Sequence, residues 1–188
     1  MPWHPLFLVV CAAWLACELW IDRRRSIPGA RRSDSGTLRL LHLALPAGMG
    51  VAGLLSLAGV WPWPPALAAS ALWTGLGLMA AGIALRVWAV RVLAEHFTVD
   101  VSIRPGHQLV RHGPYRLLRH PAYSGLLLSL LGYAVALGDL AALPAVALPA
   151  AFAFARRIRV EERVLREAFP DAYPRYARDT WRLLPWLW

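Results

Sequence analysis

The chain has 188 residues, of which 58% are hydrophobic and 16% are charged, whereas soluble domains average about 25% charged residues. This composition excludes an ordinary water-soluble globule. Of the charged residues, 20 are basic, all of them Arg, and 11 are acidic, which gives a net charge of +9. A basic excess is typical of proteins that meet nucleic acid or a membrane face. The 10 Trp favour the membrane, because indole rings settle where apolar and wet surroundings meet. We therefore expect membrane lipid as a partner, and no nucleic acid.

Five apolar stretches are candidates for membrane-spanning helices, since a hydrocarbon core of roughly 30 Å requires about 20 helical residues. They cover residues 5–20, 38–60, 67–90, 123–137 and 140–155. The last two are short and are separated only by Gly138 and Asp139, which predicts a tight helical hairpin. The positive charges of the first stretch follow it, as in a retained anchor rather than a cleaved signal peptide. The sequence therefore predicts an all-α, polytopic integral membrane protein with about five transmembrane helices.

The arginines also orient these helices. They gather after the first stretch and in residues 91–122 and 156–188, whereas residues 61–66 and 138–139 contain none. Because loops rich in Lys and Arg stay cytoplasmic, we expect the N-terminus outside and the C-terminus in the cytoplasm. The predicted organisation is one membrane domain, with an N-terminal two-helix portion over residues 1–66 and a functional core over residues 67–188.

Turn-forming and polar residues are concentrated in the segment 108–125, which reads QLVRHGPYRLLRHPAYSG. Its Gly-Pro, His-Pro and Ser-Gly pairs indicate turns directly before the fourth apolar stretch. Pro121 can open a helix at its first turn, where a missing N–H is no loss. His120 would then stand at the cap and Tyr123 in the first turn. The free N–H groups of such a turn favour an anionic or acceptor group.

The fifth stretch continues into strong helix formers, FARRIRVEERVLRE, with no breaker before Pro170. We therefore expect one helix that leaves the membrane without stopping. Arg157 and Glu161 are four residues apart and share a face. A short tail follows, with Tyr173-Pro-Arg-Tyr176 and then WRLLP, and we expect its rings to fold back over the cytoplasmic mouth.

Taken together, GPYRLLRHPAYSG, an apolar hairpin, EER, Y-x-x-Y and R-x-x-P resemble the C-terminal half of the isoprenylcysteine carboxyl methyltransferase family and its prokaryotic integral-membrane relatives. The resemblance covers roughly residues 82–185 in order and spacing. It implies an S-adenosylmethionine-dependent methyltransferase that binds its cofactor on the cytoplasmic side, under the loop and the C-terminal segment. A lipophilic acceptor would enter from the bilayer. A multi-pass protein of a bacterial inner membrane is the matching location.

The resemblance also implies roles for individual residues. Arg157 matches an arginine near the reacting group and is the expected catalytic residue. The expected cofactor-binding residues are Gln108, Leu109, Val110, Arg119, His120, Pro121, Tyr123, Gly125, Glu161 and Glu162. No metal is expected, because His96, His107 and His112 have no cysteine or acidic partners at ligand spacing.

The chemistry favours a carboxylate acceptor. A carboxylate is already an anion at neutral pH and needs only a cation such as Arg157 to hold it, whereas an amine must first lose a proton to a base. The best interpretation is therefore O-methylation of the carboxylate of an isoprenylated cysteine or a similar apolar acid. Three alternatives remain open: a phospholipid or lipid-amine N-methyltransferase, an NADPH-dependent membrane reductase related to sterol reductases, and a non-catalytic membrane protein.

Several of these residues also have structural interpretations. His120 can cap a helix, and the adjacent Glu161 and Glu162 can pair with Arg157 and Arg166 on their own helix. Tyr173 and Tyr176 are as suited to packing the tail as to touching a ligand.

Two charged residues and two glycines inside the apolar stretches also have a structural interpretation beside a functional one. Arg86 can snorkel to the interface or reach into the site, and snorkelling is favoured both for it and for Glu18. Gly75 and Gly77 are expected to serve close helix packing rather than the site.

Overall fold

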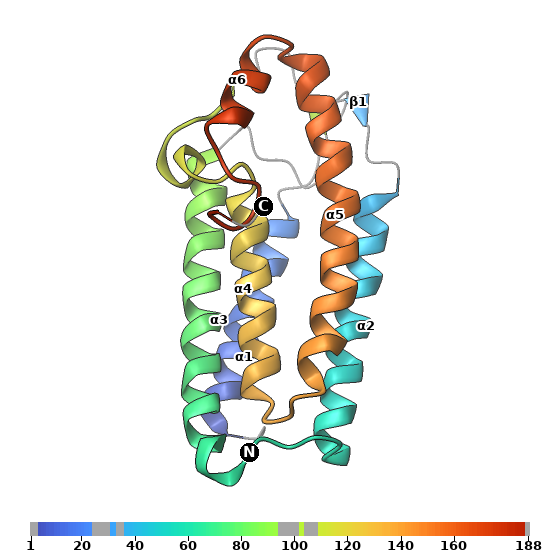
Figure 1. The fold of residues 1–188 in the computed structure, drawn as a ribbon, viewed down its shortest axis with the longest axis vertical. Coiled ribbons are helices and arrows are strands. Elements are labelled where there is room, and N and C mark those ends of the chain that lie inside the picture. The colour runs from blue at the N-terminus through green and yellow to red at the C-terminus, as the bar shows by residue number, and fades with distance from the viewer. Residues whose placement is uncertain (1–3, 24–30, 33–35, 94–101, 104–108, 187–188) are drawn as a thin grey trace.

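The computed structural model describes residues 4–23, 31–32, 36–93, 102–103 and 109–186. These residues form a bundle of long helices (Figure 1). The helices are α1 (Pro5–Asp22), α2 (Thr37–Ala58), α3 (Pro65–Leu93), the 3-10 turn η2 (Gly113–Arg116), α4 (Pro121–Ala136), α5 (Ala142–Ala168) and α6 (Ala172–Arg178). Two two-residue strands, β1 (Arg31–Arg32) and β2 (Ser102–Ile103), pair antiparallel. The predicted all-α class is confirmed.

The helices differ in how well they suit a bilayer. Helices α1, α2 and α3 are each long and apolar enough to cross one. Helix α4 is apolar but has 16 residues, which rise only about 24 Å. Helix α5 runs unbroken for 27 residues, from the apolar stretch into the charged segment, as predicted. Three of the five expected spans therefore have full membrane length, and α4 and α5 have shorter apolar lengths.

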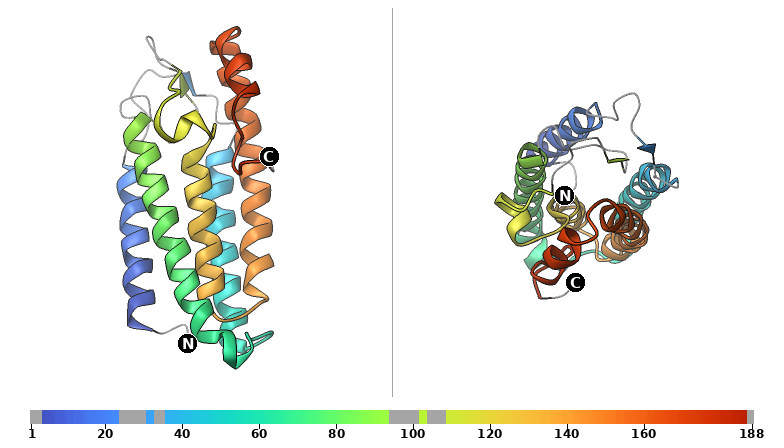
Figure 2. Two further views of the ribbon diagram at one scale, coloured as in Figure 1. Left: turned by 60° about the vertical axis from the view of Figure 1, so that its left-hand side comes forward. Right: turned by 90° about the horizontal axis from the view of Figure 1, so that it is seen from above.

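Two helix pairs make up the bundle, and α4 joins them. Helix α3 packs along α4, α2 packs along α5, and α1 lies against α3 (Figure 2). Glycines set the α3–α4 distance, because a Cβ on Gly75 would lie 2.6 Å from the Gly132 oxygen and one on Gly82 would lie 2.5 Å from the Gly125 oxygen. Contact between glycine backbones is a common way for membrane helices to pack closely. The packing prediction holds for Gly75, whereas Gly77 faces open space.

The α2–α3 connection and the α4–α5 turn meet at one end of the bundle. The buried Asp139 accepts hydrogen bonds from the backbone N–H groups of Trp61 at 3.0 Å and Ala141 at 2.8 Å. The backbone N–H of Trp63 donates to the Gly138 oxygen at 3.0 Å, and Gly138 has a positive φ of 79°. The tight hairpin predicted at Gly138 and Asp139 is therefore present, and it holds a second loop beside it.

Candidate functional site

The start of α4 is held by the C-terminal tail. The N–H of Arg119 donates to the Trp181 oxygen at 2.7 Å, and the N–H of His120 donates to the Arg182 oxygen at 3.1 Å. In return, the Trp181 N–H donates to the Leu117 oxygen at 3.0 Å, so the two extended segments run parallel. The tail folds back on the loop as predicted, through this backbone pairing and through the buried Tyr176, whose hydroxyl donates to loop carbonyl oxygens, while Trp181 stays exposed. The His120 side chain makes no capping hydrogen bond.

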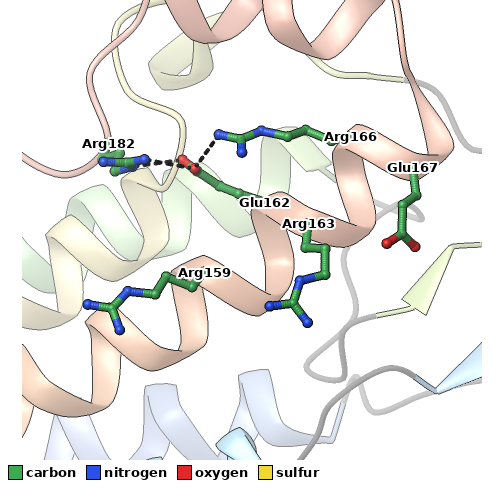
Figure 3. A pocket seen from close by; sticks show the side chains of 6 residues that line it. All are labelled: Arg159, Glu162, Arg163, Arg166, Glu167 and Arg182. Carbon is green, nitrogen blue, oxygen red and sulfur yellow. Dashed lines mark hydrogen bonds and ion pairs between the residues drawn. The ribbon is translucent and has the colours of Figure 1, made fainter.

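Glu162, on the charged half of α5, is surrounded by cationic side chains. It is only 4% exposed. Its oxygens lie 3.0 Å from Arg182 Nε and 3.3 Å from Arg166 Nη2 (Figure 3). A third arginine, Arg119, places its Nε 3.2 Å away. Burial alone would raise the pKa of this carboxyl group, but the neighbouring His120 and Arg182 outweigh burial and lower the pKa to about 2. Glu162 therefore stays anionic and ties the loop, the tail and α5 together.

The adjacent Glu161 belongs to a separate set of contacts. Its Oε2 accepts a hydrogen bond of 3.0 Å from the Tyr123 hydroxyl. That hydroxyl in turn accepts one of 3.1 Å from Arg157 Nε, and Arg157 Nη1 donates to Thr37 Oγ1 at 2.9 Å. These four residues come from α2, α4 and α5. They hold a guanidinium group that is only 2% exposed beside a carboxylate whose side chain keeps 31% exposure.

Three aromatic rings form a wall beside these groups. His120 stacks on Tyr123 with centroids 5.7 Å apart, and Tyr123 stacks on Phe154 at the same distance. The Nε2 atom of His120 is buried and has no hydrogen-bond partner among the described residues. Parallel ring faces next to a carboxylate attract a positively charged ligand group.

A partly buried ion pair supports the first turn of α4. Arg86 of α3 binds Glu18 of α1 through Nε at 2.6 Å and Nη2 at 2.7 Å. Its Nη1 donates to the Ala122 oxygen at 3.0 Å. The expectation that both residues snorkel is wrong, because the two head groups bind each other between the helices. Arg86 thus anchors the turn that carries Pro121 and Tyr123.

The structure brings together most of the predicted site. Arg157, Tyr123, Glu161 and His120 surround one cluster, and Arg119 meets His120 at Glu162. The expected pairing of the two glutamates with arginines of their own helix occurs for Glu162 and Arg166.

Other predicted residues lie apart from this cluster. Pro121 is the first residue of α4. Gly125 faces α3, where an added Cβ would lie 2.7 Å from the Arg86 nitrogen, so its position serves close packing. Leu109 and Val110 are half-buried before η2, and Val110 packs against a small cluster around Tyr115. Gln108 lies outside the described residues, as do two of the three histidines considered as ligands, His96 and His107.

Two residues of the network were not predicted from the sequence. Arg182 is the arginine of the R-x-x-P motif, so the motif contained the signal, but its partner Glu162 is 20 residues earlier. Thr37 contacts Arg157 across 120 positions of sequence, and no pattern marks it. Tyr173 and Tyr176 pack the tail. The Tyr176 hydroxyl donates to the Tyr115 backbone oxygen at 2.8 Å, and the buried Tyr173 ring meets the Tyr176 ring edge-on.

Most of the residues described above lie in a segment that matches a known family. Residues 70–172 match the family described as phospholipid methyltransferase. This segment contains every residue predicted for the site and excludes α1, α2 and Arg182.

Similar curated proteins include plant and bacterial sequences. A probable protein-S-isoprenylcysteine O-methyltransferase of Oryza sativa subsp. japonica is 34% identical over 117 residues, which are 61% of each chain. Protein-S-isoprenylcysteine O-methyltransferase B of Arabidopsis thaliana is 36% identical over 106 residues, 55% of this chain and 54% of the plant protein. The cobalt-zinc-cadmium resistance protein CzcN of Cupriavidus metallidurans is 35% identical over 127 residues, 68% of this chain and 52% of that protein. The chain thus matches between about half and three fifths of the length of these relatives.

Proposed function

The chain belongs to the phospholipid methyltransferase family, in the branch of its isoprenylcysteine O-methyltransferase relatives, and from this premise we propose that it transfers a methyl group from S-adenosylmethionine to a lipophilic acceptor. One observation carries the proposal. The buried Arg157 lies beside Tyr123 and Glu161, so a cation, an anion and a ring face meet at one place. Such a site can hold a positively charged donor and a negatively charged acceptor side by side.

The residues present fit S-adenosylmethionine, whose amino acid end carries an ammonium and a carboxylate. Glu161 offers a partly exposed carboxylate to the ammonium. The stacked rings of His120 and Tyr123 form an aromatic wall beside this carboxylate, and aromatic groups favour a positively charged sulfonium. The Nε2 of His120 lies 3.6 Å from Glu162 Oε1, so this ring links the two glutamates rather than offering an open atom to a ligand. When bound, this cofactor supplies an electrophilic methyl group. We assign Glu162 a supporting role, because its charge is taken up by Arg119 and Arg182.

The acceptor in this proposal is the carboxylate of an isoprenylated cysteine or a similar apolar acid. Arg157 holds it, because a guanidinium group can grip both carboxylate oxygens. Tyr123 and Thr37 fix the guanidinium plane through their hydrogen bonds. A carboxylate needs no general base, so the protein's contribution is mainly to align the reacting atoms.

Methylation of a phospholipid amine is the second candidate, and the description of the matched family favours it. That reaction requires a base to take a proton from the amine. Glu161 is the carboxylate at the cluster with side-chain exposure, and the Tyr123 hydroxyl bonded to it would orient it.

We further propose a multi-pass location in a bacterial inner membrane, with the Glu162 end in the cytoplasm and the N-terminus outside. The packing of the arginine-free 61–63 and 138–141 segments at one end of the bundle supports this orientation. Arginine-free loops are favoured on the outer side.

The test is a methyl-transfer assay with the full chain in lipid nanodiscs. Tritiated S-adenosylmethionine is offered with N-acetyl-S-farnesylcysteine or with phosphatidylethanolamine. We expect label in the farnesylated acid, and an Arg157→Lys variant with kcat reduced about tenfold or more because lysine lacks the two-pronged grip.

The neighbouring Arg156→Lys is the matched control, because Arg156 is exposed. Label in phosphatidylethanolamine alone would select the second candidate. Label in neither acceptor, or equal loss in both variants, would contradict the proposed substrate class.

A further inference from the structure

An arginine-rich groove lies on the exposed side of α5, away from the buried Arg157. It has a volume of about 430 Å³ and is lined by Arg159, Glu162, Arg163, Arg166, Glu167 and Arg182 (Figure 3). Four guanidinium groups thus face two carboxylates. The tail contributes Arg182 and α5 contributes the rest.

The charges in the groove are not balanced. Glu162 takes hydrogen bonds from Arg182 at 3.0 Å and from Arg166 at 3.3 Å, so those two arginines are already engaged. Arg159 and Arg163 are exposed, and neither has a hydrogen-bond or ion-pair partner in the part of the chain that the structure describes. They are four residues apart on one helix and therefore share a face. The groove presents two unpartnered cations side by side.

The same face of α5 is apolar further toward the hairpin. Leu148 and Phe152 are 70% and 57% exposed, and the spacing from Leu148 through Phe152 and Arg159 to Arg163 is 4, 7 and 4 residues. Such spacing keeps all four on one stripe of a helix. Arg159 lies about 10 Å beyond Phe152 along the axis. The stripe therefore passes from exposed apolar side chains to guanidinium groups over about two turns of the helix.

We propose that this groove binds the phosphate of an anionic membrane phospholipid, with its acyl chains along Leu148 and Phe152. Two guanidinium groups can hold phosphate oxygens through paired charge-assisted hydrogen bonds. The apolar stripe that leads to them selects a lipid over free phosphate, because free phosphate gains nothing from it. This binding is independent of methyl transfer.

The test uses the full chain, purified in mild detergent and analysed by native mass spectrometry after equal exposure to phosphatidylglycerol and phosphatidylcholine. We expect the unmodified chain to retain phosphatidylglycerol preferentially. The double variant Arg159→Gln with Arg163→Gln should retain about tenfold less, since each lost charged hydrogen bond weakens binding severalfold.

The matched control is Arg175→Gln with Arg178→Gln, which removes two exposed arginines from α6. Equal loss in both double variants would overturn the proposal, because it would reflect net charge alone. Displacement of the lipid by millimolar inorganic phosphate, with Phe152→Gln having no effect, would overturn it in favour of a free-phosphate site. Thermal unfolding of both variants near that of the parent chain confirms that folding is not the cause.

Discussion

The two halves of the molecule differ in the sequence motifs that they contain, but both contribute side chains to the site and its support. Residues 70–172 match a family and contain the GPYRLLRHPAYSG and EER motifs, and the two tail motifs follow directly after them, whereas helices α1 and α2 carry none. Yet α1 supplies Glu18 to Arg86, and α2 supplies Thr37 to Arg157. A segment without a motif can complete a site, because a supporting side chain needs only to reach its partner.

The halves also differ in how densely their charges are connected. Glu162 in the matched segment is shared among arginines of the loop, the tail and its own helix. Glu18 in the N-terminal half has one cationic partner, Arg86, and one indole donor, Trp14 at 3.3 Å. We therefore expect substitutions in the matched segment to lower the free energy of unfolding more than substitutions in the N-terminal half.

The largest effect is expected for Glu162→Gln. Removing one partner of a buried ion pair leaves uncompensated charge and costs about 3–5 kcal/mol, here shared between Arg119 and Arg182. Thermal unfolding measures the loss, and faster tryptic cleavage at Arg178 or Arg182 reports release of the tail. Glu167→Gln, at an exposed position on the same helix, is the control. Equal behaviour of the two variants would contradict the role given to Glu162.

Acid should remove the stabilisation that the ionised Glu162 provides. The folded pKa of Glu162, about 2, is below its ordinary 4.5, so its stabilisation is fully present above about pH 4.5 and is lost as the pH falls toward 2. The size corresponds to about 3 kcal/mol. The measurement is the difference in unfolding free energy between the parent chain and Glu162→Gln across this range. A difference that stays constant from pH 6 to pH 2.5 would refute the assignment.

A smaller effect is expected for Glu18→Gln in the N-terminal half. It leaves the buried Arg86 without its carboxylate, at a cost of about 1–3 kcal/mol. The double variant with Arg86→Gln should recover part of this loss, and a double-mutant cycle gives the coupling energy. Asp171→Asn serves as control, since Asp171 is exposed and its side chain makes no capping hydrogen bond to α6. Simple additivity in the cycle would show that the pair contributes nothing.

The smallest effect is expected for Thr37→Val, which keeps the shape and removes one hydrogen-bond acceptor. We expect a loss of about 1 kcal/mol, with recovery in Thr37→Ser, because serine keeps the hydroxyl that Arg157 donates to. Chemical denaturation of the three proteins measures it. If valine and serine behave alike, α2 merely packs against the site.

Much of the architecture could be predicted, because composition and periodicity reflect burial. The all-α class, the hairpin at Gly138 and the unbroken α5 follow from apolar length and helix breakers. The short fourth stretch was also predicted, over residues 123–137, and α4 runs from Pro121 to Ala136. The division at residue 66 remains a prediction.

The site was predicted only in part, and the failures share a cause. Local motifs identified His120, Tyr123 and Glu161 as residues of one site, but they did not show that Glu161 and its neighbour Glu162 have different partners. Adjacent residues on a helix point about 100° apart, so the two carboxylates meet different partners. Contacts such as Arg86 with Glu18, 68 positions apart, depend on helix packing, which no local pattern encodes.

Because residues 117–120 pair with residues 181–182, this part of the site can form only after the C-terminal tail has been synthesised. A ribosome makes Arg119, His120 and Glu162 before it makes Arg182, so these groups wait for their last partner while the chain is being inserted. A chain that ended before residue 180 would contain all the long helices, yet it would leave Glu162 without Arg182 and the start of α4 without its backbone partners.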